Sequence, residues 1–248
     1  MKKTLSILFI GNSHTYYNDM PLMVQQRAEE EGFDCRVFMI AHGGWFLAQH
    51  AGEPDVRFNL LYGKYDYVIL QEHAHPFGPF EKFRDAAVAL NELIRKGGSI
   101  PVIYETWSRK DEPDMQAVMN EAHRMVAAEI GALVAPVGKN WWEYKKSHPT
   151  LELYAEDGGH ASPAGSDFAA KYIWENDTGT LEPSVVRSLR IDRMIRSRPK
   201  HPNDGQIGIC RDTCRQGKSG NSFELTTHYN LIRGELNEKN LHRSAHAV

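Results

Sequence analysis

The chain has 248 residues, of which 41 % are hydrophobic and 25 % are charged, and its net charge is −3. These values exclude a fibrous chain, a fully disordered chain and a protein with many membrane spans. Residues 1–180 hold 17 Lys and Arg against 25 Asp and Glu, whereas residues 181–248 hold 12 against 7. Of the 25 aromatic residues, 23 lie in the first 180. We therefore expect a folded domain over 1–180 and a basic, aromatic-poor, partly disordered extension over 181–248.

Short apolar segments alternate with longer amphipathic ones along the first 180 residues. The apolar segments predict strands over residues 5–10, 35–40, 67–70, 100–104 and 132–137. The amphipathic segments predict helices over residues 20–31, 80–96, 114–130 and 163–174, the last with Ser162 as its N-cap. This alternation predicts the α/β class, as a three-layer α/β/α sandwich with a mainly parallel five-stranded sheet. Ligands bind such sheets outside the carboxyl ends of the strands.

Cysteines and terminal segments place few further constraints on function. The three cysteines, Cys35, Cys210 and Cys214, are too sparse for a disulfide framework and lack a strong zinc pattern. The first apolar run, residues 5–10, is too short for a signal peptide or a membrane span. The basic extension lacks a nucleic-acid-binding motif. We expect a cytoplasmic protein that binds neither membrane nor nucleic acid.

The first predicted strand leads directly into the segment Gly11-Asn12-Ser13-His14-Thr15. Glycine permits a tight turn, and a helix can begin near Asp19 or Met20. Ser13 then stands at the carboxyl end of the strand and faces the ligand crevice as a candidate nucleophile. A turn in which Ser13 only caps the helix explains the same residues, so this alternative stays open.

A second polar segment, Asp157-Gly158-Gly159-His160, precedes the last predicted helix. A serine nucleophile needs a base within hydrogen-bond reach, and the base needs an acceptor that orients it. Ser13, His160 and Asp157 would supply these roles. Because Asp and His at this spacing also fit a metal pair or a helix start, the segment alone does not decide between them.

Two more segments follow the second and third predicted strands. Residues 41–45 include Gly43 and Gly44, whose backbone N–H groups could bind a developing oxyanion, although a flexible loop has the same composition. Residues 70–73 read Leu-Gln-Glu-His, and the Gln71 amide or the His73 imidazole could donate to the same oxyanion. A polar strand end is the alternative interpretation of this second segment.

Together, and in this order, the four segments resemble the blocks of the SGNH hydrolase superfamily, which is also called GDSL-like. The resemblance covers about residues 5–175 and is nearest to a bacterial subgroup with Gly-Asn-Ser at the nucleophile and Leu-Gln-Glu after the third strand. It implies a flavodoxin-like fold, esterase chemistry without metal or cofactor, and a triad of Ser13, His160 and Asp157. It also implies that the Ser13 and Gly44 N–H groups line the oxyanion hole.

The sequence departs from the family pattern at two places. Asn12 replaces the usual Asp before the serine, a position outside the triad. The usual Asn donor of the third block is absent, and Gln71 is our first candidate to replace it, with His73 as the alternate. Loss of one oxyanion donor costs about 3 kcal/mol, so an active enzyme is expected to have a replacement.

The predicted function is that of a serine esterase acting on small acyl esters, with acetylated carbohydrates as one candidate class. Substrate contacts are expected from Asn12, His14, Trp45 and Glu72. Several aromatic residues are expected in loops or near strand ends, where they could form sugar platforms, although buried packing is their commoner role: Trp45, Phe46, Trp107, Trp141 and Trp142.

Two alternatives to an esterase stay open on sequence alone. A non-catalytic carbohydrate-binding protein could use the same fold, because fold does not guarantee activity. A metal-dependent hydrolase is the other alternative. Its candidate ligands would be Glu72, His73, His75, Asp157 and His160.

Overall fold

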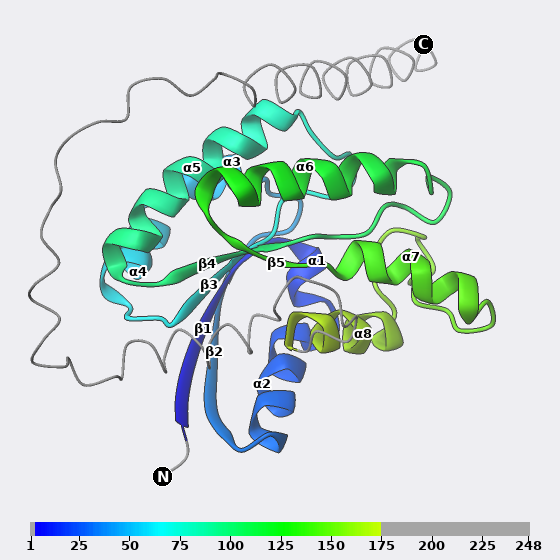
Figure 1. Cartoon of the computed structure of the whole chain (residues 1–248), viewed down its shortest axis with the longest axis horizontal. Coiled ribbons are helices and arrows are strands. Elements are labelled where there is room, and N and C mark those ends of the chain that lie inside the picture. Colours follow the sequence, from blue (N-terminus) through cyan, green and yellow to red (C-terminus); the bar gives the residue numbers. More distant parts are fainter. Residues whose placement is uncertain (1–2, 175–248) are drawn as a thin grey trace, which may run out of the picture. The chain divides into compact units, whose positions relative to one another are not determined.

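The computed structural model describes residues 3–174 (Figure 1). These residues form one all-parallel, five-stranded sheet in the order β2-β1-β3-β4-β5. Its strands are β1 (Lys3–Gly11), β2 (Phe33–Ala41), β3 (Tyr67–Leu70), β4 (Ile100–Tyr104) and β5 (Leu133–Ala135). The expected fold class is therefore confirmed. The expected domain boundary near residue 180 and the extension over 181–248 lie outside the described residues.

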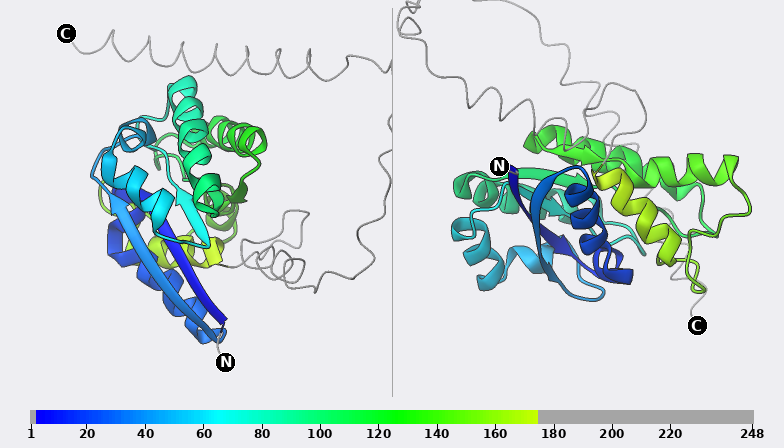
Figure 2. Two further views of the ribbon diagram at one scale, coloured as in Figure 1. Left: turned by 90° about the vertical axis from the view of Figure 1, so that its left-hand side faces the viewer. Right: turned by 90° about the horizontal axis from the view of Figure 1, so that it is seen from below.

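Helices cover both faces of the sheet and complete three layers. In Figure 1, α5 and α6 lie on one face and α2 and α8 on the other; α2 and α8 also pack side by side (Figure 2). The helical segments are α1 (Ser13–Tyr16), the 3-10 turn η1 (Tyr17–Asp19), α2 (Met20–Glu30), α3 (Leu47–Ala51), α4 (Pro54–Tyr62), α5 (Phe80–Gly97), α6 (Met115–Ile130), α7 (Val137–Ser147) and α8 (Pro163–Trp174). None of these described helices combines the length and apolar character needed to cross a membrane.

The three central strands form the core because their side chains are apolar on both faces. All four residues of β3 are buried, as are residues 7–10 of β1 and 101–104 of β4. Such continuous burial is typical of a parallel sheet sandwiched between helices. The edge strand β2 is different, since Phe38 and Met39 are each more than two-fifths exposed.

Capping residues mark the end of α5 and the start of α8. Gly98 ends α5 with φ +87°, a left-handed conformation that glycine adopts without steric cost. At α8, the Ser162 hydroxyl oxygen accepts from the Gly165 N–H at 3.1 Å, which confirms Ser162 as a capping residue with Pro163 at the first helical position.

Four helices, α1, α3, α4 and α7, were not expected from the sequence. In α4 only Val56 and Leu60 are buried, so the apolar periodicity is too weak to read as a helix. The predicted strand over 132–137 is shorter than expected, because Val137 already begins α7. Trp141 and Trp142 therefore lie on a helix rather than in a loop.

The strand order determines where a ligand can bind. Chain connections run in opposite directions from β1 and from β3, and this reversal between neighbouring strands opens a crevice at their carboxyl ends. Ser13 lies two residues after the end of β1 at this crevice, and Gln71 directly follows β3.

Candidate active site

Ser13 is the first residue of the short helix α1, immediately after β1. The N-cap of this helix is Asn12, whose side-chain oxygen accepts from the His14 N–H at 3.0 Å. The alternative in which Ser13 itself serves as the cap is therefore wrong. At the first helical position, the Ser13 N–H has no acceptor within the helix.

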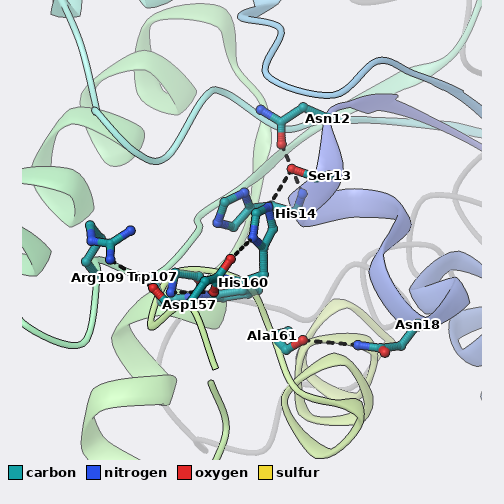
Figure 3. A network of polar contacts seen from close by, with 10 residues as sticks. Asn12, Ser13, His14, Asn18, Trp107, Arg109, Asp157, His160 and Ala161 are labelled. Atoms are coloured by element: carbon teal, nitrogen blue, oxygen red, sulfur yellow. Dashed lines mark hydrogen bonds and ion pairs between the residues drawn. The ribbon is translucent and has the colours of Figure 1, made fainter. Parts of the chain in front are cut away.

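The structure brings Ser13, His160 and Asp157 into one hydrogen-bonded relay (Figure 3). Ser13 Oγ lies 2.7 Å from His160 Nε2, although the two residues are 147 positions apart in the chain. His160 Nδ1 lies 2.5 Å from Asp157 Oδ2. Because a carboxylate only accepts, Nδ1 carries the proton, and the Nε2 lone pair accepts from the Ser13 hydroxyl.

Asp157 is held as a charged acceptor by its own turn. Its Oδ1 accepts the Gly159 and His160 backbone N–H groups, both at 2.9 Å. Desolvation opposes the charge, but the hydrogen bonds from the His160 ring and these two N–H groups lower the pKa of Asp157 well below its usual range. The Asp157 carboxylate is therefore ionised in the folded protein near neutral pH.

Residues after β4 fix the loop that carries this carboxylate and base. The Trp107 indole N–H donates to the Gly159 carbonyl at 2.8 Å, Arg109 Nη2 donates to the Asp157 carbonyl at 2.9 Å, and the Lys110 N–H donates to the Gly158 carbonyl at 2.9 Å. Sequence reasoning missed these three supports. Their position after a parallel strand, at the same edge as Ser13, is the signal that could have indicated them.

The glycine turn after β2 lies beside the nucleophile. Asn12 Nδ2 donates to the Trp45 carbonyl at 2.9 Å, and the Trp45 N–H donates to the His42 carbonyl at 3.2 Å. Gly44 has φ +72°, which strongly favours glycine, and it is exposed. Asn12 thus ties the turn containing Gly44 to the residue before Ser13.

The structure corrects the expectation that the Gln71 amide serves as an oxyanion donor. Gln71 is fully buried, and its Oε1 accepts from the Asn12 N–H at 2.8 Å and from the Thr15 hydroxyl at 2.9 Å. These two donors fix the orientation of the amide, whose Nε2 donates to the Glu72 carbonyl. Gln71 therefore supports the turn under the nucleophile and does not present its N–H groups to the crevice.

His73, the alternate oxyanion donor, already uses one ring nitrogen in a hydrogen bond within the protein. Its Nδ1 lies 3.0 Å from the Pro76 carbonyl, so Nδ1 carries the proton in the neutral ring and Nε2 is an acceptor. The ring stacks on Phe46 at 4.2 Å between centroids. His73 can donate through Nε2 only when its ring is protonated, which leaves the two backbone N–H groups as the expected donors.

Three of the four residues expected to contact substrate are buried. Asn12, His14 and Glu72 are 1 %, 7 % and 2 % exposed, so they support the site from within, and that expectation is corrected. Trp45 is half-buried beside His42 and stays a candidate contact. Trp107 and Trp141 are fully buried and stack on each other at 4.0 Å, so they pack the core and do not bind sugar.

Glu72 is a buried carboxyl that joins two active-site loops. Its side-chain oxygens accept from the His73 N–H at 2.7 Å and the Leu47 N–H at 3.4 Å. Desolvation outweighs these hydrogen bonds and raises its pKa from 4.5 to about 7. A carboxyl whose pKa is raised by folding contributes stability below its unfolded pKa and loses it as pH rises through the folded pKa.

We therefore predict a pH-dependent stability difference between the wild type and Glu72→Gln, which does not ionise. Relative to the variant, the wild type is expected to lose about 3 kcal/mol of unfolding free energy between about pH 4 and pH 8. Urea unfolding of both proteins at the two pH values measures this. The same stability difference at both pH values would contradict the shifted pKa.

The residues proposed as metal ligands do not form a metal centre in the described part of the chain. Over residues 3–174, no three His, Cys, Asp or Glu side chains are arranged so that they could hold one ion. His160 and Asp157 are instead bonded to each other and to Ser13. Within this described range, no arrangement of side chains favours the metal-dependent alternative.

No protein-family model and no curated protein matches the chain. Solved structures do match. A protein from Slackia heliotrinireducens, provisionally classed as an SGNH hydrolase, is 30 % identical with a TM-score of 0.61, and the match covers 69 % of this chain and 98 % of that one.

Two more distant structures share the fold. The psychrotrophic esterase EstA from Pseudoalteromonas sp. is 12 % identical with a TM-score of 0.55, and the match covers 75 % of this chain and 98 % of that one. An acetylxylan esterase from Geobacillus stearothermophilus is 18 % identical with a TM-score of 0.50, covering 69 % and 93 % of the two chains. Identity across nearly the whole Slackia protein, together with the shared fold, shows that the chain belongs to the SGNH hydrolase family.

Proposed function

We propose that this hydrolase is a serine esterase that cleaves small acyl esters through an acyl-enzyme. The observation that carries the proposal is the relay Ser13–His160–Asp157, with distances of 2.7 and 2.5 Å. Each residue has a partner suited to its role: the serine hydroxyl faces an imidazole lone pair, and the imidazole N–H faces an ionised carboxylate.

In the first half-reaction, Ser13 Oγ attacks the ester carbonyl carbon while His160 Nε2 takes the hydroxyl proton. The carbonyl oxygen becomes an oxyanion, and the Ser13 and Gly44 N–H groups bind it in the proposed hole. The Asp157 carboxylate stabilises the imidazolium that forms. His160 then gives its proton to the leaving alcohol, and the acyl group remains bonded to Ser13 Oγ.

In the second half-reaction, water takes the place of the alcohol. His160 accepts a proton from water as the oxygen attacks the acyl carbon, and the same N–H groups bind the second oxyanion. Collapse of this intermediate releases the carboxylic acid, and His160 returns the proton to Ser13 Oγ. Apart from the ester and water, every group that acts in the proposed cycle is a side chain or backbone group of this chain.

Short acyl groups on a carbohydrate are the substrate class that we propose for this site. One structural neighbour is an acetylxylan esterase, and this likeness of fold motivates the proposal. Trp45 and Phe46 are half-buried next to the glycine turn, where aromatic faces could contact a sugar ring. A panel of acetylated sugars and of simple acyl esters of increasing chain length compares these alcohols and acyl groups directly.

Fluorophosphonate labelling tests the proposed nucleophile. We expect one covalent phosphonyl adduct, which peptide mass analysis assigns to Ser13, because only a serine activated by a base reacts rapidly. Protein unfolded in urea serves as the control and is expected to remain unlabelled. Labelling at a different serine would contradict the triad. Sugar binding without labelling or turnover would instead favour the non-catalytic carbohydrate-binding alternative.

A further inference from the structure

Tyr17 lies flat against the catalytic imidazole. The Tyr17 and His160 ring centroids are 4.1 Å apart, and the ring planes differ by only 9°. The His160 side chain keeps 25 % of its surface exposed, so Tyr17 covers only part of it. Because the ring nitrogens of His160 bind Ser13 and Asp157 in the ring plane, the Tyr17 contact adds a constraint perpendicular to those bonds.

A second ring contacts His160 from inside the protein. His14 stacks on His160 with centroids 4.9 Å apart and planes 30° apart. His14 also contacts Trp107, which is itself stacked on Trp141, so a fully buried aromatic pair backs the His14 ring. Burial and the neighbouring histidines lower the pKa of His14 well below its usual range. A neutral ring here adds no repulsion when His160 becomes positively charged.

The same short segment carries both rings and the nucleophile. Ser13 and His14 lie in α1, and Tyr17 begins η1. The Asn18 amide donates to the Ala161 carbonyl at 3.1 Å (Figure 3). It also donates to Ser166 Oγ at 2.9 Å. Ser166 Oγ in turn donates to the Tyr17 carbonyl at 3.1 Å. This segment is therefore hydrogen-bonded to the part of the chain that carries His160.

We propose that Tyr17 and His14 form an aromatic clasp that fixes the ring plane of His160, and that Tyr17 is a positioning residue for the base. Its catalytic consequence rests on the proposed function. Stacking restricts rotation of the imidazole about its bond to Cβ and keeps Nε2 directed at Ser13 Oγ. The tyrosine face also attracts the imidazolium that forms when Ser13 attacks, since an aromatic face stabilises a cation.

Kinetics of three variants test the positioning role. Tyr17→Leu keeps apolar bulk without a ring and is expected to lower kcat about 3- to 10-fold with KM unchanged, the size of one aromatic contact. Tyr17→Phe keeps the ring and is expected to retain kcat. Tyr62→Leu, an exposed tyrosine on α4, controls for the loss of a surface ring. Unchanged kcat in Tyr17→Leu, or equal losses in Tyr17→Leu and Tyr17→Phe, would overturn the positioning role.

Nuclear magnetic resonance of the histidine ring protons tests the stack independently of catalysis. In the wild type, the His160 signals, assigned by their disappearance in His160→Asn, are expected upfield because Tyr17 shields them. This shielding should be lost in Tyr17→Leu and kept in Tyr17→Phe. Unshielded His160 signals in the wild type would overturn the clasp. If Ser13 resists the fluorophosphonate while the shielding is present, the proposed function fails and the clasp stands.

Discussion

Replacing Ser13 by alanine is expected to lower kcat for a short acyl ester by about 10⁶-fold, the loss typical of removing a triad nucleophile. Ser13 Oγ lies 2.7 Å from His160 Nε2 and is the nucleophilic atom of the relay. Without it no acyl-enzyme can form, and the backbone N–H groups alone can assist only direct attack by water. The measurement is the initial rate at saturating ester.

The control for this prediction is Ser147→Ala, because Ser147 is exposed and lies at the end of α7. It should retain the activity of the wild type. Thermal unfolding of both variants separates loss of chemistry from loss of fold, and Ser13→Ala should unfold at nearly the wild-type temperature. A well-folded Ser13→Ala that still hydrolyses the ester at the wild-type rate would refute the assignment of the nucleophile.

Replacing Asp157 by asparagine is expected to lower kcat by about 10⁴-fold. The cause can be derived from the turn. Asp157 Oδ1 accepts two backbone N–H groups, from Gly159 and His160, so the asparagine oxygen will take this position. Its NH2 group then faces His160 Nδ1 and acts as a donor. The imidazole proton must move to Nε2, where it opposes the Ser13 hydroxyl and cannot accept the serine proton.

Asp167→Asn is the matched control, because Asp167 is an exposed carboxylate paired with Arg27 on the surface. It should leave kcat unchanged, since exposed ion pairs contribute little. The pH profile adds a second measurement. The pKa of Asp157 lies well below its usual range, so in the wild type its protonation cannot be the cause of lost activity near neutral pH. A kcat within tenfold of the wild type in Asp157→Asn would contradict the derived tautomer change.

Much of the fold could be predicted because its cues are local. The predicted strands over 67–70 and 100–104 agree with β3 and β4, since a continuous apolar run marks a strand buried on both faces. Ser162 before Pro163 marked the start of α8. In contrast, α7 was missed, because Trp141 and Trp142 are adjacent and give no helical period, and only packing shows that Trp141 is buried.

The candidate site also has features that the sequence predicted and features that it did not. Its polar segments could be identified because three of them follow predicted parallel strands, whose carboxyl ends form the ligand crevice, and the fourth precedes the last predicted helix. The role of Gln71 could not be predicted, because a side-chain amide can either donate to an oxyanion through its N–H or accept through its oxygen. In the structure the Gln71 oxygen accepts from the Asn12 N–H. The buried state of His14 was equally unpredictable, since a polar side chain beside the nucleophile normally suggests a substrate contact.

The sequence by itself determined the α/β class, the order of the active-site segments and the identity of Ser13, Asp157 and His160 as candidates, because these depend on residue type and on position along the chain. Only the tertiary structure decided that Ser13 and His160 meet although they are 147 positions apart in the chain. It also decided that the Gln71 amide binds the turn at Asn12 and that the Tyr17 ring contacts the His160 ring. The physical reason is that hydrogen bonds and ring contacts act over a few ångströms, and long-range folding sets those distances.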